Sequence, residues 1–149
     1  MNKLYILILF LISFNLNAQE IKLEKIVEDL NKPWSFTFVD QNNIIFTEKA
    51  GKLYSLNLND KKKVEIKHNL SVLEVGQGGL LDVLYYNGHI YISYSENRGD
   101  WKTSTSVAKG DFNRSNIQFK NIFQAEPPID SGYHFGSRLV IKNKYLYIT

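Results

Sequence analysis

The chain has 149 residues, a formal net charge of +3, a hydrophobic share of 44% and no cysteine. This length predicts about one domain, the hydrophobic share can support a packed core, and stability must come from packing because no disulfide can form. Basic and acidic side chains are nearly balanced, and the one basic run, Lys61–Lys63, has the form of a solvated turn, so the composition argues against a nucleic-acid-binding protein.

The first 18 residues have the form of a secretory signal peptide. Lys3 precedes an apolar run, Leu4–Phe14, and the small residue Ala18 follows at the expected cleavage position. A membrane-spanning helix needs about 20 apolar residues, and Asn15 and Asn17 end this run early. We therefore predict a signal peptide over residues 1–18, removed on export, with no stable membrane span afterwards. An uncleaved anchor is the alternative.

From Ile21 onward the sequence predicts β-strands and no amphipathic helix. Apolar residues alternate with polar ones, and aromatic and β-branched residues, which suit half-buried strands, are frequent. The Asn87-Gly88 pair predicts a type I′ hairpin turn, because both central positions of that turn need a positive φ. The strands expected from this pattern are residues 35–39, 44–47, 52–56, 84–86, 90–94, 106–108 and 139–141.

The strand pattern also recurs. Ile44–Thr47, Ile90–Ser93 and Leu146–Thr149 each follow a short polar turn and an earlier strand. Their spacing is close to the repeat of about 40–50 residues that is typical of four-stranded propeller blades, whereas a β-sandwich explains the strands but not the recurrence. We expect two blades and the start of a third over residues 19–149. A closed propeller needs about four blades, so this is a partial domain.

A glycine-rich segment, Gly76–Asp82, is the first candidate functional element. Clustered glycines allow the backbone to approach a ligand closely or to bend sharply into a strand, and Gln77 offers both a donor and an acceptor. The alternative is an ordinary connection whose glutamine faces water. A phosphate-binding loop is not supported, because neither a Lys-Ser/Thr pair nor a helix follows.

The second candidate element is Asp130–Leu139, in which His134 stands between aromatic residues directly before a predicted strand. A histidine near its ordinary pKa can accept a proton, and the loops that lead into propeller strands surround the central channel. The alternative is a histidine packed between Tyr133 and Phe135 and satisfied by the backbone.

The rest of the chain offers no further candidate site. His68 follows a charged strand and His89 adjoins the Asn-Gly turn, so both are expected at the surface. The sequence contains no metal-ligand spacing, no nucleophile elbow and no paired carboxylates. We therefore predict no metal ligand in these 149 residues.

Five segments, taken in chain order, resemble the PQQ-dependent aldose sugar dehydrogenases, also called soluble glucose dehydrogenases or glucose/sorbosone dehydrogenases (PQQ is pyrroloquinoline quinone). The match runs from about Leu30 to the last residue. It implies an all-β, six-bladed β-propeller. The segments are Asn31–Phe36 with its Pro-Trp pair, Phe46–Leu53 with a Thr-Glu-x-x-Gly-x-Leu hairpin, Gly76–Asp82, Tyr91–Glu96 followed by Thr105–Gly110, and Gly132–Leu139 with His-Phe-Gly-x-Arg-Leu.

The resemblance also implies a chemistry. His134 corresponds to the general base that removes the proton from the anomeric hydroxyl of a sugar, while a hydride passes to PQQ and a lactone forms. Gln77 corresponds to a polar residue at the PQQ–sugar site. The family's Arg, Asn and Lys contacts to the PQQ carboxylates and its Ca²⁺ ligands fall beyond Thr149, so the 149 residues alone are expected to be inactive.

The implied protein is periplasmic or secreted, with a small sugar as substrate, an external electron acceptor as partner, and no nucleic acid. Two other classes remain open. One is a cofactor-free propeller that binds carbohydrate or protein. The other is a propeller hydrolase acting on lactones, which would need a cluster of acidic and Asn metal ligands that these residues do not supply.

Overall fold

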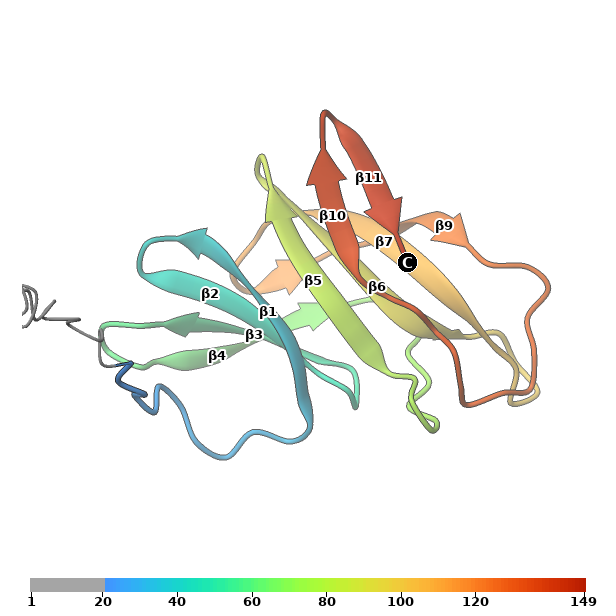
Figure 1. Cartoon of the computed structure of the whole chain (residues 1–149), viewed down its shortest axis with the longest axis horizontal. Helices are drawn as coiled ribbons and strands as arrows, with labels where there is room; N and C mark the ends of the chain where they lie inside the picture. Colours follow the sequence, from blue (N-terminus) through green and yellow to red (C-terminus); the bar gives the residue numbers. More distant parts are fainter. Residues whose placement is uncertain (1–20) are drawn as a thin grey trace, which may run out of the picture.

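The structure, a computed structural model, describes residues 21–149, so the predicted signal peptide lies outside the described residues. This part of the chain contains strands and connections only, arranged as three sheets that stand side by side (Figure 1). No helix in it is long and apolar enough to span a membrane. The strands are β1 (Pro33–Asp40), β2 (Asn43–Glu48), β3 (Lys52–Asn57), β4 (Lys63–His68), β5 (Leu80–Tyr86), β6 (His89–Asn97), β7 (Thr103–Asp111), β8 (Asn116–Ile117), β9 (Lys120–Gln124), β10 (Leu139–Lys142) and β11 (Tyr145–Ile148).

The first two sheets are four-stranded antiparallel meanders, which is the form of a propeller blade. The first runs β1-β2-β3-β4 and the second β5-β6-β7-β9. Alternate residues of both sheets fill one apolar core that includes Ile45, Leu53 and Ile92. The hairpin predicted between β5 and β6 is confirmed, because Asn87 and Gly88 have φ values of 49° and 79°.

The third sheet consists of the hairpin β10–β11. The three recurring segments seen in the sequence are therefore β2, β6 and β11, each the second strand of its sheet. The first strands β1, β5 and β10 lie next to one another, with β5 in contact with both of the others. The repeated unit predicted from the sequence is thus confirmed in the described residues, with two blades and the start of a third.

Four elements differ from the predicted pattern. β4 was expected only as a charged strand that ends before His68, whereas the strand includes this residue. β5 begins at Leu80, so the last residues of the glycine-rich segment belong to a strand rather than to a loop. β8 and β9 were not predicted, because neither has a clear alternation of apolar and polar residues. β8 adds a fifth, parallel strand to the outer edge of the first sheet, where Ile117 is 1% exposed and joins the shared core.

His68 is only partly exposed, although it was expected at the surface, and both of its ring nitrogens are hydrogen-bonded to the backbone. Its Nε2 donates to the Gly51 carbonyl at 2.9 Å and its Nδ1 accepts from the Leu70 N–H at 3.2 Å, an assignment fixed by the backbone groups that it meets. Burial lowers the pKa of His68 below its ordinary value, which favours the neutral ring. His89 is partly exposed beside its hairpin and is hydrogen-bonded to Asp111 at 2.8 Å.

Candidate functional site

Three connections meet at one end of the sheets: the β2–β3 turn, the β4–β5 connection and the β9–β10 connection. The last two lie at the lower ends of β5 and β10 (Figure 1). The Gln77 N–H donates to the Gly132 carbonyl at 2.7 Å, and the Leu80 N–H donates to the Lys49 carbonyl at 2.9 Å. These two backbone bonds clamp the glycine-rich segment between the other two connections.

The glycines of this segment allow that clamp to form. A Cβ on Gly76 would collide with the Gly132 carbonyl, and a Cβ on Gly79, whose φ is 149°, would collide with the Lys49 carbonyl. Only glycine has room at such close backbone approaches. The close approach expected from the sequence is therefore made to neighbouring loops, and it brings together residues far apart in the chain.

Gln77 and His134, the two site residues predicted from the sequence, are in direct contact. The Gln77 Oε1 accepts the His134 N–H at 3.0 Å. A backbone N–H can only donate, so the oxygen of the Gln77 amide must face His134 and the NH₂ group must face away. This bond holds His134 at a φ of 64°, in the left-handed region that a residue other than glycine rarely adopts.

The imidazole of His134 is exposed and free to contact a ligand. Within residues 21–149 neither ring nitrogen has a hydrogen-bond partner, and the centroid of the neighbouring Tyr133 ring is 6.4 Å away. Phe135 instead is 8% exposed and fills the space under the loop. The alternative of a packed histidine ring satisfied by the backbone is thus wrong. The packed ring of this loop is that of Phe135.

A hollow of about 400 Å³ joins the predicted residues to two that the sequence analysis did not select, Trp34 and Lys49. Of the described residues that line it, Lys49 is a full cation and none is a carboxylate. A signal for both residues existed, since Trp34, the second residue of β1, and Lys49, which directly follows β2, both lie in segments that carry the family resemblance. The lining residues are Trp34, Lys49, Gly76, Gln77, Leu81, His134, Phe135 and Gly136.

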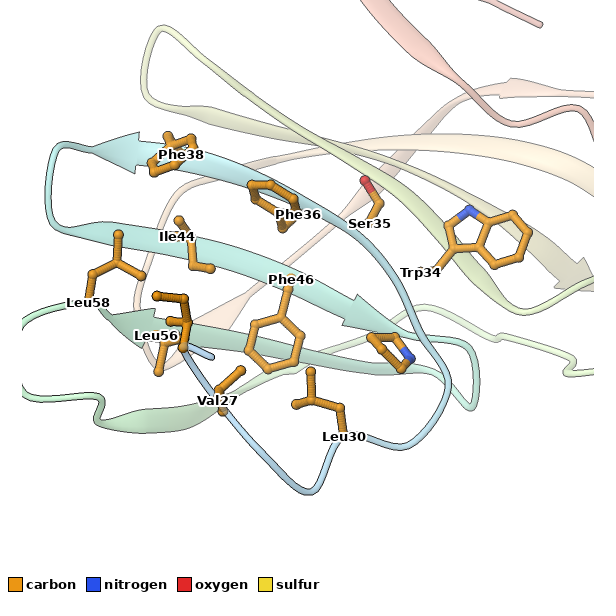
Figure 2. A pocket seen from close by; sticks show the side chains of 12 residues that line it. Val27, Leu30, Trp34, Ser35, Phe36, Phe38, Ile44, Phe46, Leu56 and Leu58 are labelled. Atoms are coloured by element: carbon orange, nitrogen blue, oxygen red, sulfur yellow. The ribbon is translucent and has the colours of Figure 1, made fainter. Parts of the chain in front are cut away.

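A larger hollow of about 570 Å³ lies on the outer face of the first sheet, where Phe36 and Phe38 project from β1 (Figure 2). The side chains that line it are apolar apart from one serine, and none of them is acidic or basic. Such a face fits sheet-on-sheet packing and offers no group for acid–base chemistry. The smaller hollow beside His134 is therefore the candidate site.

The side chain of Asp82 links all three sheets next to the candidate site. Its side chain lies in β5, is 9% exposed, and accepts the Ser35 hydroxyl of β1 at 2.5 Å. Its other oxygen accepts the Leu139 N–H of β10 at 2.8 Å, and the Arg138 guanidinium lies at 3.3 Å. Because Leu139 directly follows the His134 loop, this carboxylate fixes the point at which that loop ends.

Ser137 is the strained position of the loop, and we expect Ser137→Gly to stabilise the protein by about 1–2 kcal/mol. The residue is fully buried with a φ of 106°, and its hydroxyl has no hydrogen-bond partner in the described chain. Glycine removes both the strained Cβ and the unsatisfied oxygen, and its higher unfolded-state entropy offsets only part of this gain.

Urea unfolding of the wild type, Ser137→Gly and Ser137→Ala checks this expectation. Alanine removes the hydroxyl but keeps a Cβ at the same φ, so its midpoint should fall between the other two. A glycine variant that unfolds at lower urea than the wild type would contradict the strain argument.

No cluster that could hold a metal ion is present in the described part of the chain, where no three His, Asp or Glu side chains gather closely enough. The site instead combines an exposed imidazole, a carboxamide and an ammonium group around one hollow. These groups can move a proton and bind oxygen atoms of a ligand.

The sequence model of the glucose/sorbosone dehydrogenases matches residues 30–149. This range is most of the chain, and the chain therefore belongs to the glucose/sorbosone dehydrogenase family. The all-β propeller fold of the quinoprotein glucose dehydrogenase type, expected from the sequence, is confirmed with it.

Individual relatives agree. The aldose sugar dehydrogenase YliI of Escherichia coli (strain K12) is 31% identical over 138 residues, which cover 86% of this chain and 37% of that protein. The crystal structure of a glucose dehydrogenase superposes with a TM-score of 0.78 at 30% identity, over 84% of this chain and 39% of the other. The chain thus spans about two fifths of the length of these relatives.

A further solved structure supports the fold alone. The PQQ-bound aldose sugar dehydrogenase of Streptomyces coelicolor has a TM-score of 0.72 at 16% identity, over 85% of this chain and 40% of the other. At this identity the likeness shows that the sheets are arranged in the same way. It does not by itself carry the ligand of that protein over to this chain.

Proposed function

We propose that the full-length protein carrying this chain is a PQQ-dependent dehydrogenase that oxidises aldose sugars at the anomeric carbon to lactones, with His134 as the general base. The observation that carries the proposal is the contact between Gln77 and His134 beside a hollow that is open to a ligand. Family membership and the name of the E. coli relative support the same class of reaction.

His134 would receive the proton of the anomeric hydroxyl. Its ring is exposed at the hollow. In a neutral imidazole one ring nitrogen carries a free lone pair, which can accept that proton. General-base catalysis of this kind contributes about 10²–10⁴-fold to a rate. The Gln77 oxygen fixes the backbone from which the imidazole projects, and such orientation is itself a large part of catalysis.

PQQ, when bound, supplies a quinone that accepts the hydride. The residues of the hollow fit this group, because the Lys49 ammonium and the Gln77 NH₂ are donors and PQQ presents carboxylate and quinone oxygens that accept. Gln77 and Lys49 are thus the groups of this chain that would hold it. Calcium does not fit the described residues, which gather no ligand set, and we place its ligands in another part of the protein.

The location and processing of the protein also belong to this proposal. An export signal over residues 1–18 would deliver residues 19–149, as part of the propeller domain, to the periplasm or the exterior. An external electron acceptor would then reoxidise the cofactor there. The apolar run after Lys3 is the support for this placement.

The test is reconstitution of the full-length apoprotein with PQQ and Ca²⁺, followed by addition of an aldose and an artificial dye as electron acceptor. We expect dye reduction that depends on both PQQ and sugar, together with formation of the lactone. Sugar binding without dye reduction at saturating PQQ would contradict the proposal and indicate a cofactor-free binding propeller.

A further inference from the structure

We propose that Lys49 is a binding residue for an anionic oxygen group of the ligand in this site, and, where the proposed function holds, for a carboxylate of PQQ. The residue lies in the turn between β2 and β3 and lines the same hollow as Gln77 and His134. The sequence assigns no role to this residue, so the inference rests on its contacts.

The ammonium of Lys49 is held at the hollow by groups that carry no negative charge. Its Nζ donates to the Gly76 carbonyl at 2.9 Å and lies 5.7 Å from the centroid of the Trp34 ring. The carbonyl and the indole face both attract a cation, but neither carries a charge. Two further N–H groups of the ammonium remain for a ligand.

Neighbouring lysines show the contrast. At the same end of the first sheet the Lys32 ammonium pairs with Glu74 at 2.7 Å, and Lys52, the first residue of β3, pairs with Glu65 at 3.4 Å. Lys49 forms no ion pair with any carboxylate in residues 21–149, although it is half-buried. A half-buried cation without a counter-charge is costly, and an anion bound beside it would lower that cost.

Gln77, like Lys49, offers hydrogen-bond donors to a ligand in the hollow. Its oxygen is committed to the His134 N–H, so the free part of its side chain is the NH₂ group, which donates. This edge of the hollow therefore offers donors, and no carboxylate lines the hollow. A sugar hydroxyl both donates and accepts, whereas a carboxylate only accepts. A carboxylate also carries the negative charge that would pair with the Lys49 ammonium. The edge matches the carboxylate better.

The experiment measures PQQ binding to the full-length apoprotein by quenching of tryptophan fluorescence, which does not depend on turnover. Lys49→Met removes the charge and keeps the length of the side chain, while Lys49→Arg keeps a cation. Lys109→Met is the matched control, because Lys109 is also half-buried, lies 5.6 Å from the Tyr91 ring and is outside the hollow.

We expect Lys49→Met to raise the Kd for PQQ at least about tenfold, as the loss of a charge-assisted hydrogen bond requires. Lys49→Arg should stay within about threefold of the wild type, Lys109→Met should bind like the wild type, and added salt should weaken wild-type binding more than that of Lys49→Met. The KM for sugar at saturating PQQ should change less than about twofold in every variant.

Two results would overturn the inference alone: an unchanged Kd for PQQ in Lys49→Met, or a raised KM for sugar with an unchanged Kd, which would assign Lys49 to the sugar. A wild type that neither binds PQQ nor oxidises an aldose would overturn the proposed function, and the PQQ contact with it. The wild-type measurement therefore separates the two failures.

Discussion

Replacement of His134 by asparagine is expected to lower kcat of the full-length, PQQ-loaded protein by about 10²–10⁴-fold, because an amide cannot take the proton of the sugar hydroxyl. Asparagine is the informative substitution, since it tolerates the left-handed backbone that His134 adopts at a φ of 64°. Alanine at this position would add backbone strain to the loss of the base. The measurement is steady-state dye reduction at saturating PQQ and sugar.

The matched control is His89→Asn, which removes a histidine at the β5–β6 hairpin that pairs with Asp111 of β7, outside the candidate site. Its kcat should equal that of the wild type. The PQQ affinity of His134→Asn should also be preserved, since the substitution leaves Lys49 and the Gln77 amide in place. A His134→Asn protein with near-normal kcat would refute the assignment of the base.

The sequence predicted most of the inner strands because their alternation is local. Residues 35–38 and 90–94 carry apolar side chains at every second position, and the structure places them in β1 and β6. β8 was missed for the opposite reason. Its two residues form a strand only because Ile117 is drawn into the core of the neighbouring sheet, and no local pattern encodes that contact.

The residues of the candidate site likewise fall into those that the sequence predicted and those that it did not. His134 and Gln77 were selected from their glycine-rich surroundings and from the family resemblance, and they are in contact across 57 residues of chain. Lys49 and Trp34 were not selected, because a lysine in a turn and a tryptophan at the start of a strand are common. The contacts of Lys49 with Gly76 and Gly79, which are distant in sequence, show that this turn belongs to the site.

The same dependence on long-range contacts makes Asp82 a sensitive position. We expect Asp82→Ala to lower the free energy of unfolding by about 3–5 kcal/mol, because the buried Leu139 N–H and the Ser35 hydroxyl both lose their acceptor and Arg138 loses its carboxylate. The three sheets then lose their common link. Urea unfolding of the full-length protein, followed by circular dichroism, measures the change.

Two variants separate the role of the carboxylate from a general effect of mutation. Asp82→Asn keeps one acceptor oxygen for the Leu139 N–H, and its NH₂ can donate to a reoriented Ser35 hydroxyl, so it should lose less stability than alanine. Asp130→Ala removes an exposed carboxylate from the segment that leads to His134 and should change stability by less than about 0.5 kcal/mol. If Asp82→Ala unfolds at the same urea concentration as Asp130→Ala, the link between the sheets must come from apolar contacts between β1, β5 and β10 instead.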